Sequence, residues 1–174
     1  MDNINLGDKT KFVGWKINGV TNCLELCKMI LRKYGLTNFG NSNNTITLLK
    51  EINGKLEYAT KNPNITYRNA IKCIDKHLEN KRPIIVGVNH TIDKGINEGT
   101  TDHFVVIYGK EYKDNELYYL YYEVGKGNII DGYNDAENRF KYENTKYPAF
   151  YDEKSNIKQK RFDVIQIRPN DGTI

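Results

Sequence analysis

The stretch that decides the expected fold runs from His103-Phe-Val-Val-Ile-Tyr-Gly109 to Leu117-Tyr-Tyr-Leu-Tyr-Tyr-Glu-Val124. Both runs are rich in the β-branched and aromatic residues that favour strands. Between them lies Lys113-Asp114-Asn115, a group typical of tight turns. The sequence therefore predicts that the two runs pair as an antiparallel β-hairpin.

The length of the turn determines which residues face each other across this hairpin. A three-residue turn sets Tyr112 opposite Glu116 and His103 opposite Gly125. Glu123 then lies diagonal to His103 on the same face, with about 7–8 Å between the backbones. A glutamate side chain is long enough to bridge that gap, whereas a β-bulge would shift the register.

Two more strands are expected on either side of the hairpin. Pro83-Ile-Ile-Val-Gly-Val-Asn89 is a continuous apolar run, which is typical of a strand buried on both faces. A polar loop over residues 90–102 leads from it to the hairpin. After the hairpin, an irregular stretch precedes a closing strand at Phe162-Asp-Val-Ile-Gln-Ile-Arg168.

A first helix is expected from about Cys23 to Tyr34, where apolar residues recur at helical spacing along one face. Thr21 or Asn22 can cap its start, and Gly35 is a natural stop. Cys23 therefore lies in the first turn of this helix.

A second helix is expected from about Tyr67 to Glu79, with Thr66 as its cap. Residues 36–66 are rich in Asn and Thr, which indicates loops with little regular structure. Helices come first in the chain and antiparallel strands follow, so the sequence predicts an α+β fold. No repeat or linker interrupts residues 1–174, which indicates a single domain.

Charge and hydropathy argue against nucleic-acid binding and against a membrane-spanning protein. The net charge is +4, from 26 basic and 22 acidic side chains, and the longest basic cluster is Lys158-Gln159-Lys160-Arg161. Nucleic-acid binding would need tighter clustering, so no nucleic-acid partner is expected. No apolar run is long enough to span a bilayer, and the N-terminus lacks the apolar core of a signal peptide.

Cys23 is the candidate nucleophile. At the start of a helix, unpaired backbone N–H groups and the helix dipole favour a thiolate. Cys27 lies one turn deeper and Cys73 lies in the middle of the second helix, so both are expected to be structural. Three cysteines make an odd count, which favours a reduced, thiol-using protein over a disulfide framework.

His103 is the candidate general base. It opens an apolar strand directly after a polar loop, where a side chain emerges at a sheet edge. His90, at the end of the preceding strand, is its main rival. A base needs a third group that orients its ring, and Glu123 is placed for that role by the expected hairpin register.

Three segments resemble the bacteriocin-leader-processing branch of the papain-like cysteine peptidases. Thr21-Asn-Cys-Leu-Glu-Leu-Cys-Lys-Met-Ile-Leu-Arg-Lys-Tyr-Gly35 is similar to the nucleophile helix of that branch. Arg82-Pro-Ile-Ile-Val-Gly-Val-Asn89 and Asp102-His-Phe-Val-Val-Ile-Tyr-Gly109 are similar to its strand hallmarks. The resemblance implies a papain-like fold, with an N-terminal nucleophile helix packed on an antiparallel sheet. It also implies amide-bond hydrolysis without a metal or organic cofactor.

The chain departs from that family at the residues around the thiol. Leu24-Glu25 stands where the family has Gly-Pro, and Glu123 stands where it has Asp or Asn. The family also places a Gln before the Cys to build the oxyanion hole, and this chain has none there. Asn18 and Asn22 are the candidate substitutes, together with the Cys23 backbone N–H.

Several functions stay open on this basis. The leading one is a cysteine peptidase that acts on a protein or peptide through Cys23, His103 and Glu123. A peptidoglycan amidase or endopeptidase would use the same chemistry, and a binding module could have kept the fold without the activity. A zinc site formed by Cys23, Cys27, His90 and His103 fits poorly, because a Cys-x3-Cys pair in one helix suits zinc badly and Cys27 is expected to point into the core.

The resemblance also suggests a biological setting. Compact members of this kind are similar to toxin domains of bacterial secretion effectors, which are made in the cytoplasm and delivered into a target cell. A cognate immunity protein that covers the mouth around Cys23, His103 and the 90–102 loop is then an expected partner.

Overall fold

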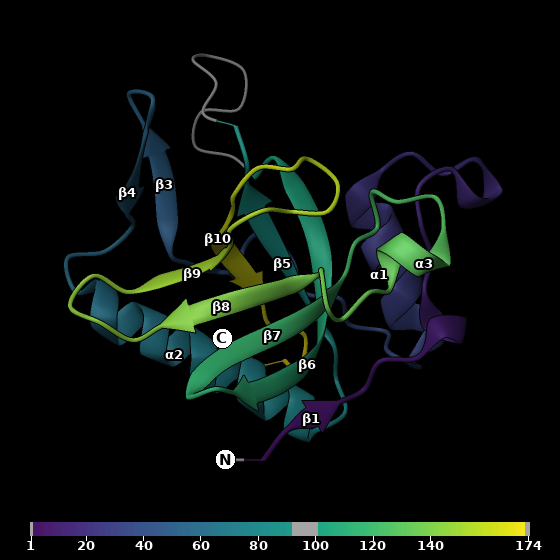
Figure 1. The fold of residues 1–174 in the computed structure, drawn as a ribbon, viewed down its shortest axis with the longest axis horizontal. Helices are drawn as coiled ribbons and strands as arrows, with labels where there is room; N and C mark the ends of the chain where they lie inside the picture. The colour runs from purple at the N-terminus through teal and green to yellow at the C-terminus, as the bar shows by residue number, and fades with distance from the viewer. Residues whose placement is uncertain (1, 92–100, 173–174) are drawn as a thin grey trace.

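The computed structural model describes residues 2–91 and 101–172 of the chain. Its centre is a closed barrel of six antiparallel strands in the order β6-β5-β10-β9-β8-β7, closed by pairing of β7 with β6 (Figure 1). The barrel strands are β5 (Ile84–Asn89), β6 (His103–Lys113), β7 (Glu116–Tyr122), β8 (Arg139–Glu143), β9 (Ala149–Asp152) and β10 (Phe162–Arg168).

The prediction of a papain-like α+β fold, with the N-terminal helix packed on an antiparallel sheet, is wrong. The described chain is mostly antiparallel sheet with a closed barrel and only a few short helices. The difference arises in the stretch that was expected to be irregular, where β8 and β9 lie. Phe140 and Phe150 on these strands are fully buried, and Phe140 stacks on Tyr121 of β7 at 4.3 Å between ring centroids. Strands of four or five residues bury only alternate side chains, so their apolar pattern is too short to stand out.

Helices cover two sides of the barrel (Figure 1). Strand β6 alternates between them: Val105 and Ile107 pack in the cluster that includes helix α2 (Pro63–Glu79). Val106 and Tyr108 pack in the cluster that includes helix α1 (Cys23–Lys33). Successive strand residues point to opposite faces, so one strand contributes to both layers of the core.

Helix α1 has the predicted start and ends one residue early, whereas α2 begins one turn before the predicted Tyr67. Pro63 occupies its first turn after Asn62, where a missing N–H costs nothing. Residues 36–66 contain three short strands in place of the expected loops. They are β2 (Ile46–Thr47), β3 (Leu49–Ile52) and β4 (Lys55–Tyr58); the remaining elements are β1 (Ile4–Asn5), α3 (Ile129–Gly132) and two 3₁₀ turns, Lys9–Lys11 and Ile17–Gly19.

The predicted hairpin exists, but its turn has two residues rather than three. Lys113 pairs with Glu116, and Asp114 and Asn115 both have positive φ, as a two-residue turn of this twist requires. A bulge between Ile107 and Gly109 then shifts the register by one residue. Beyond the bulge the pairing follows the predicted register, which keeps Glu123 on the side of His103.

The expected buried strand is confirmed, since every residue of β5 is buried. The expected 90–102 loop lies for the most part outside the described residues. None of the described helices combines the length and the apolar composition needed to cross a bilayer.

Candidate active site

Helix α1 begins at Cys23, and Asn22 caps it. The Asn22 side chain accepts a hydrogen bond of 3.1 Å from the Glu25 backbone N–H. The half-buried Cys23 sulfur therefore lies at the positive end of the helix. Burial by itself would raise the pKa of the Cys23 thiol. Hydrogen bonding to His103, the charge of His103 and the backbone N–H groups of Phe104 and Leu24 outweigh burial and lower that pKa below its ordinary value.

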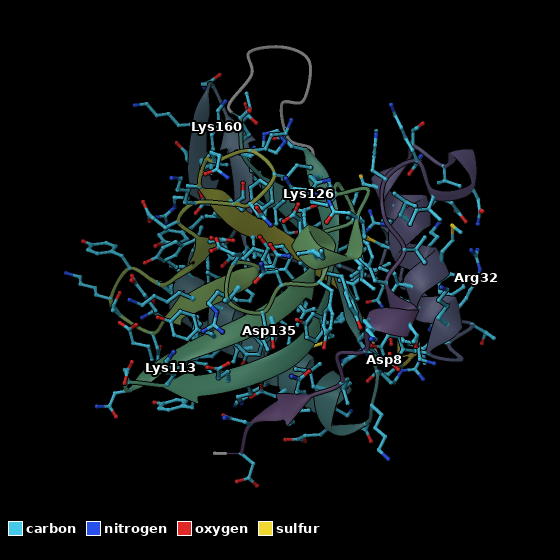
Figure 2. The ribbon with its side chains drawn as sticks, turned by 45° about the vertical axis from the view of Figure 1, so that its right-hand side comes forward. Asp8, Arg32, Lys113, Lys126, Asp135 and Lys160 are labelled. Carbon is cyan, nitrogen blue, oxygen red and sulfur yellow. The ribbon has the colours of Figure 1, made fainter. Side chains whose placement is uncertain are left out.

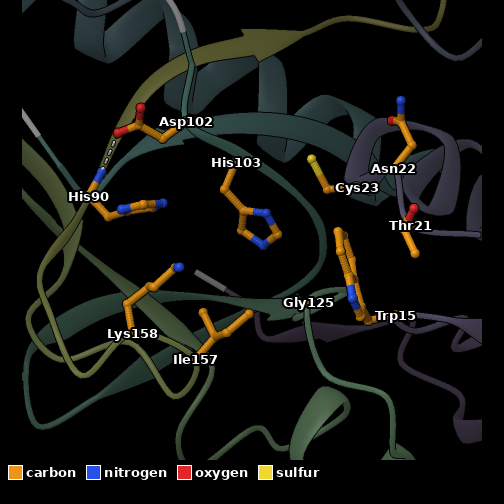
Figure 3. Close-up of a pocket in the computed structure, with 10 residues that line it drawn as sticks. All are labelled: Trp15, Thr21, Asn22, Cys23, His90, Asp102, His103, Gly125, Ile157 and Lys158. Carbon is orange, nitrogen blue, oxygen red and sulfur yellow. Dashed lines mark hydrogen bonds between the residues drawn. The ribbon is translucent and has the colours of Figure 1, made fainter. Parts of the chain in front are cut away.

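His103 is the first residue of β6, and its ring reaches both Cys23 and Glu123. Its Nε2 lies 2.5 Å from Glu123 Oε1, and the interaction with Cys23 contributes to its raised pKa. Because Nε2 serves the carboxylate, Nδ1 is the nitrogen left for the thiol. Figure 3 shows a ring nitrogen of His103 on the side of Cys23. The structure therefore brings the three predicted residues together, with His103 hydrogen-bonded to Glu123 and facing Cys23 across the cleft.

Glu123 follows β7 directly and is fully buried. Its Oε1 accepts hydrogen bonds from His103 Nε2 and, at 2.8 Å, from the Gly125 backbone N–H. Its Oε2 is buried without a hydrogen-bond partner among the described residues. A buried carboxylate with so few donors is costly unless a positive charge faces it, and the imidazolium of His103 supplies that charge.

The His103 imidazole favours its protonated form. Desolvation works against the charge, but the Glu123 carboxylate and the hydrogen bonds to Cys23 and Glu123 raise the pKa of His103 well above its ordinary value. The raised pKa of the base and the lowered pKa of the thiol describe one arrangement. Both shifts favour the thiolate–imidazolium form of the pair, beside a buried carboxylate.

The pair lies in a cleft of about 530 Å³, a size that fits a ligand of several residues. Gly125 forms part of its lining, and a larger residue there would require the Ile157 side chain to move. A Cβ at this position would lie 2.0 Å from Ile157 Cδ1 and 3.0 Å from Glu123 Oε1. The residues that line the cleft are Trp15, Thr21, Asn22, Cys23, His90, Asp102, His103, Gly125, Ile157 and Lys158 (Figure 3).

The two candidate oxyanion-hole side chains lie in different places relative to the cleft. Asn18 is exposed on the 3₁₀ turn Ile17–Gly19 and does not line the cleft, so the structure does not bring it to the thiol. Asn22 lines the cleft, but its oxygen caps the helix and its amide points away from His103 in Figure 3. The Cys23 backbone N–H at the helix start is the remaining expected donor.

The rival base, His90, lines the same cleft but makes other contacts. Its Nδ1 lies 2.8 Å from Thr91 Oγ1, and its backbone N–H donates to Asp102. Burial lowers the pKa of His90, which favours the neutral ring. The geometry therefore favours His103 over His90 as the partner of the thiol.

The other two cysteines are not placed as nucleophiles. Cys27 is fully buried in the core, as expected, and burial raises its pKa. Cys73 is half-buried in α2, and burial raises its pKa to about 11. The inward position of Cys27 removes it from a zinc set with His90 and His103. Among the described residues, no group of three or more His, Cys, Asp or Glu side chains is placed to hold a metal ion.

Sequence reasoning missed four residues of the cleft: Trp15, Asp102, Ile157 and Lys158. Trp15 is the only tryptophan of the chain, which could have drawn attention to it. Ile157 and Lys158 come from the segment between β9 and β10, far from the other site residues in sequence. Figure 2 shows that charged side chains are spread over helices, strands and loops, Arg32, Lys113, Lys126, Asp135 and Lys160 among them.

Comparison of the chain with models of protein families, with curated proteins and with solved structures found no match.

Proposed function

We propose that this chain is a cysteine hydrolase that cleaves amide bonds of a protein or peptide, with Cys23 as nucleophile. The observation that carries the proposal is the arrangement of these groups at the helix start. One ring nitrogen of His103 is on the side of Cys23 in Figure 3, and the other lies 2.5 Å from the fully buried Glu123 carboxylate. A nucleophile, a base and a group that orients the base, lined up in a cleft, are the parts that acyl transfer needs.

The proposed reaction has two half-steps. The Cys23 thiolate attacks the carbonyl carbon while the Cys23 backbone N–H stabilises the developing oxyanion. The imidazolium of His103 gives its proton to the leaving amine, and the amine departs. Neutral His103 then takes a proton from water, which attacks the acyl-enzyme and releases the acid. Glu123 holds the ring in the orientation that serves both steps and stabilises its positive charge.

Site-specific labelling tests the nucleophile. Iodoacetamide at neutral pH should alkylate Cys23 much faster than Cys73, because the thiolate is the reactive form. Cys23→Ala should abolish amide hydrolysis of a denatured-protein substrate. Cys73→Ala is the matched control, since it removes a half-buried thiol from another helix. Equal labelling of Cys23 and Cys73 would remove the basis of the proposal.

Peptide stems of peptidoglycan are a second substrate class for the same chemistry. The peptidase and amidase functions can be distinguished by incubating the protein and its Cys23→Ala variant with purified peptidoglycan and with a cell lysate. Release of new amines from peptidoglycan alone would favour the amidase. New protein fragments in the lysate alone would favour the peptidase.

We further propose that the domain acts as a toxin in competing bacteria, with an immunity protein as its natural inhibitor. An amide hydrolase in the cytoplasm needs either a narrow substrate range or a protein that blocks its cleft. A blocking protein would act most simply at the mouth that Trp15, Cys23 and Lys158 line, because occlusion there excludes every substrate.

A further inference from the structure

The cleft has different chemistry on the two sides of the Cys23–His103 pair. In Figure 3, Trp15, Thr21 and Asn22 lie on the Cys23 side. His90, Ile157 and Lys158 lie on the other side, beyond His103 (Figure 3). An indole wall therefore faces one end of a bound substrate, and a lysine and a second histidine face the other end.

The chemistry of the proposed reaction determines which end is which. The carbonyl carbon must reach the Cys23 sulfur, and the leaving nitrogen must reach His103 to take its proton. The leaving group therefore extends over His103 toward Lys158. The acyl group extends the opposite way, along the first turn of α1 and past Trp15.

Trp15 is held in place by its backbone. Its N–H donates to the Lys126 carbonyl at 3.0 Å. A Cβ on Gly14 would lie only 2.0 Å from that same oxygen, and a Cβ on Gly127 would lie 3.2 Å from the Trp15 carbonyl. Gly14 and Gly127, one on each of the two segments, allow their backbones to approach closely. The backbone of Trp15 is thus hydrogen-bonded to the segment that follows Glu123.

The indole is also placed to receive a ligand. Trp15 is half-buried and packs on the core cluster around α1. In Figure 3 the ring is seen nearly edge-on, with one face turned toward His103. An aromatic face at the wall of a cleft gains contact area and stacking from an apolar or aromatic side chain, and little from glycine.

We propose that Trp15 is the specificity-determining residue for the acyl side of the cleft, and that it selects substrates with a large apolar residue next to the scissile carbonyl. This inference rests on the proposed cysteine chemistry and adds the substrate class. Its physical basis is a pre-positioned aromatic wall, which costs little entropy to order on binding.

Two reagents that occupy only the acyl side test this proposal. They are the chloromethyl ketones of acetyl-leucyl-phenylalanine and of acetyl-glycyl-glycine. In each, the Cys23 sulfur forms a bond to the methylene carbon, the carbon–chlorine bond breaks and chloride leaves. Each alkylation rate, measured by mass spectrometry, is divided by the rate of the same reagent with free glutathione. Iodoacetamide, which fills neither side, reports the reactivity of the thiol itself.

The corrected rate with the leucyl-phenylalanine reagent should exceed that with the glycine reagent by about tenfold or more in the unmodified protein. Trp15→Ala should bring this ratio to about one while iodoacetamide still labels Cys23 rapidly. Trp15→Phe should keep most of the preference. Tyr112→Ala, which removes a surface aromatic side chain at the far end of β6, should leave the ratio unchanged.

Trp15 provides a second readout because it is the only tryptophan. Labelling with the leucyl-phenylalanine reagent should change the tryptophan emission, whereas labelling with iodoacetamide should change it little. A ratio near one in the unmodified protein, or a ratio that survives Trp15→Ala, would overturn the inference and leave the nucleophile standing. If iodoacetamide labels Cys23 no faster than Cys73, the proposed function fails and this inference fails with it.

Discussion

Replacing Glu123 by glutamine removes one charge from the centre of the site and little else. Glu123 is fully buried, and its Oε1 accepts from His103 Nε2 at 2.5 Å and from the Gly125 N–H at 2.8 Å. A glutamine oxygen can keep both contacts, so the ring should keep the same tautomer. The new amide group would take the place of Oε2, which has no hydrogen-bond partner in the described part of the chain.

The sign of the effect follows from the two shifted pKa values. The Glu123 carboxylate is the main cause that raises the pKa of His103, so Glu123→Gln lowers that pKa toward the ordinary value. A smaller fraction of His103 is then protonated beside Cys23. Burial, which raises the pKa of the thiol, is then opposed less strongly, and the Cys23 pKa rises. The thiolate should form only at higher pH than in the unmodified protein.

An opposite charge at this distance stabilises the ionised partner by about 1.4–4 kcal/mol. The ratio of the thiolate–imidazolium pair to the neutral thiol and imidazole near pH 6 should therefore fall by about 10- to 1000-fold. The assay is the rate at which iodoacetamide alkylates Cys23, followed by mass spectrometry from pH 5 to 9. The inflection of that profile should move to higher pH in the variant, and amide hydrolysis at neutral pH should fall in proportion.

Glu25→Gln is the matched control for this experiment. Glu25 lies in the same helix as Cys23, is half-exposed and pairs with Arg32 at 2.9 Å, an interaction that water screens. Its profile should lie within about twofold of the unmodified protein. Superimposable profiles for Glu123→Gln and the unmodified protein would refute the idea that Glu123 sets the charge of His103.

The remaining predictions concern the thiols, the histidines and the biological setting. Cys27→Ala should keep activity and lower the free energy of unfolding by about 1 kcal/mol through a small core cavity, which thermal unfolding measures; Cys23→Ala should unfold like the unmodified protein. His103→Ala should reduce amide hydrolysis by at least about 100-fold and His90→Ala far less, so the reverse ranking would assign the base to His90. Expression in a bacterial cytoplasm should slow growth, and Cys23→Ala should relieve this. Growth arrest only on periplasmic targeting would point to the cell wall, and harmlessness in both compartments would end the toxin proposal.

Local sequence pattern was sufficient for the elements whose signal lies within one segment. Helix α1 begins at Cys23 as predicted, because a capping residue, an apolar stripe and a glycine stop all lie within a few residues of one another. Strand β10 has the predicted bounds, and β5 is buried throughout. The thiol at a helix start could thus be read from the sequence, because that position is a local property of the chain.

The contact between His103 and Glu123 was anticipated for a partly mistaken reason. The predicted turn was one residue too long, and a bulge between Ile107 and Gly109 offsets that difference. Turn geometry and bulges are decided by small backbone energies that residue types signal weakly. The two differences cancel, so the register near His103 is the predicted one.

Closure of the barrel was decided only by the tertiary structure. Strands β8 and β9 are short, and their stability comes from packing between strands. Phe140 of β8 packs against Tyr121 of β7 and Phe150 of β9, and these side chains meet only when the sheet closes. The same holds for the cleft, where Trp15 and Lys158 lie at opposite ends of the sequence and at opposite ends of one site. Local propensity places single residues on helices and strands. Which of those residues meet is determined by contacts between segments far apart in the sequence. The energy of those contacts arises only in the assembled core, so no single segment encodes it.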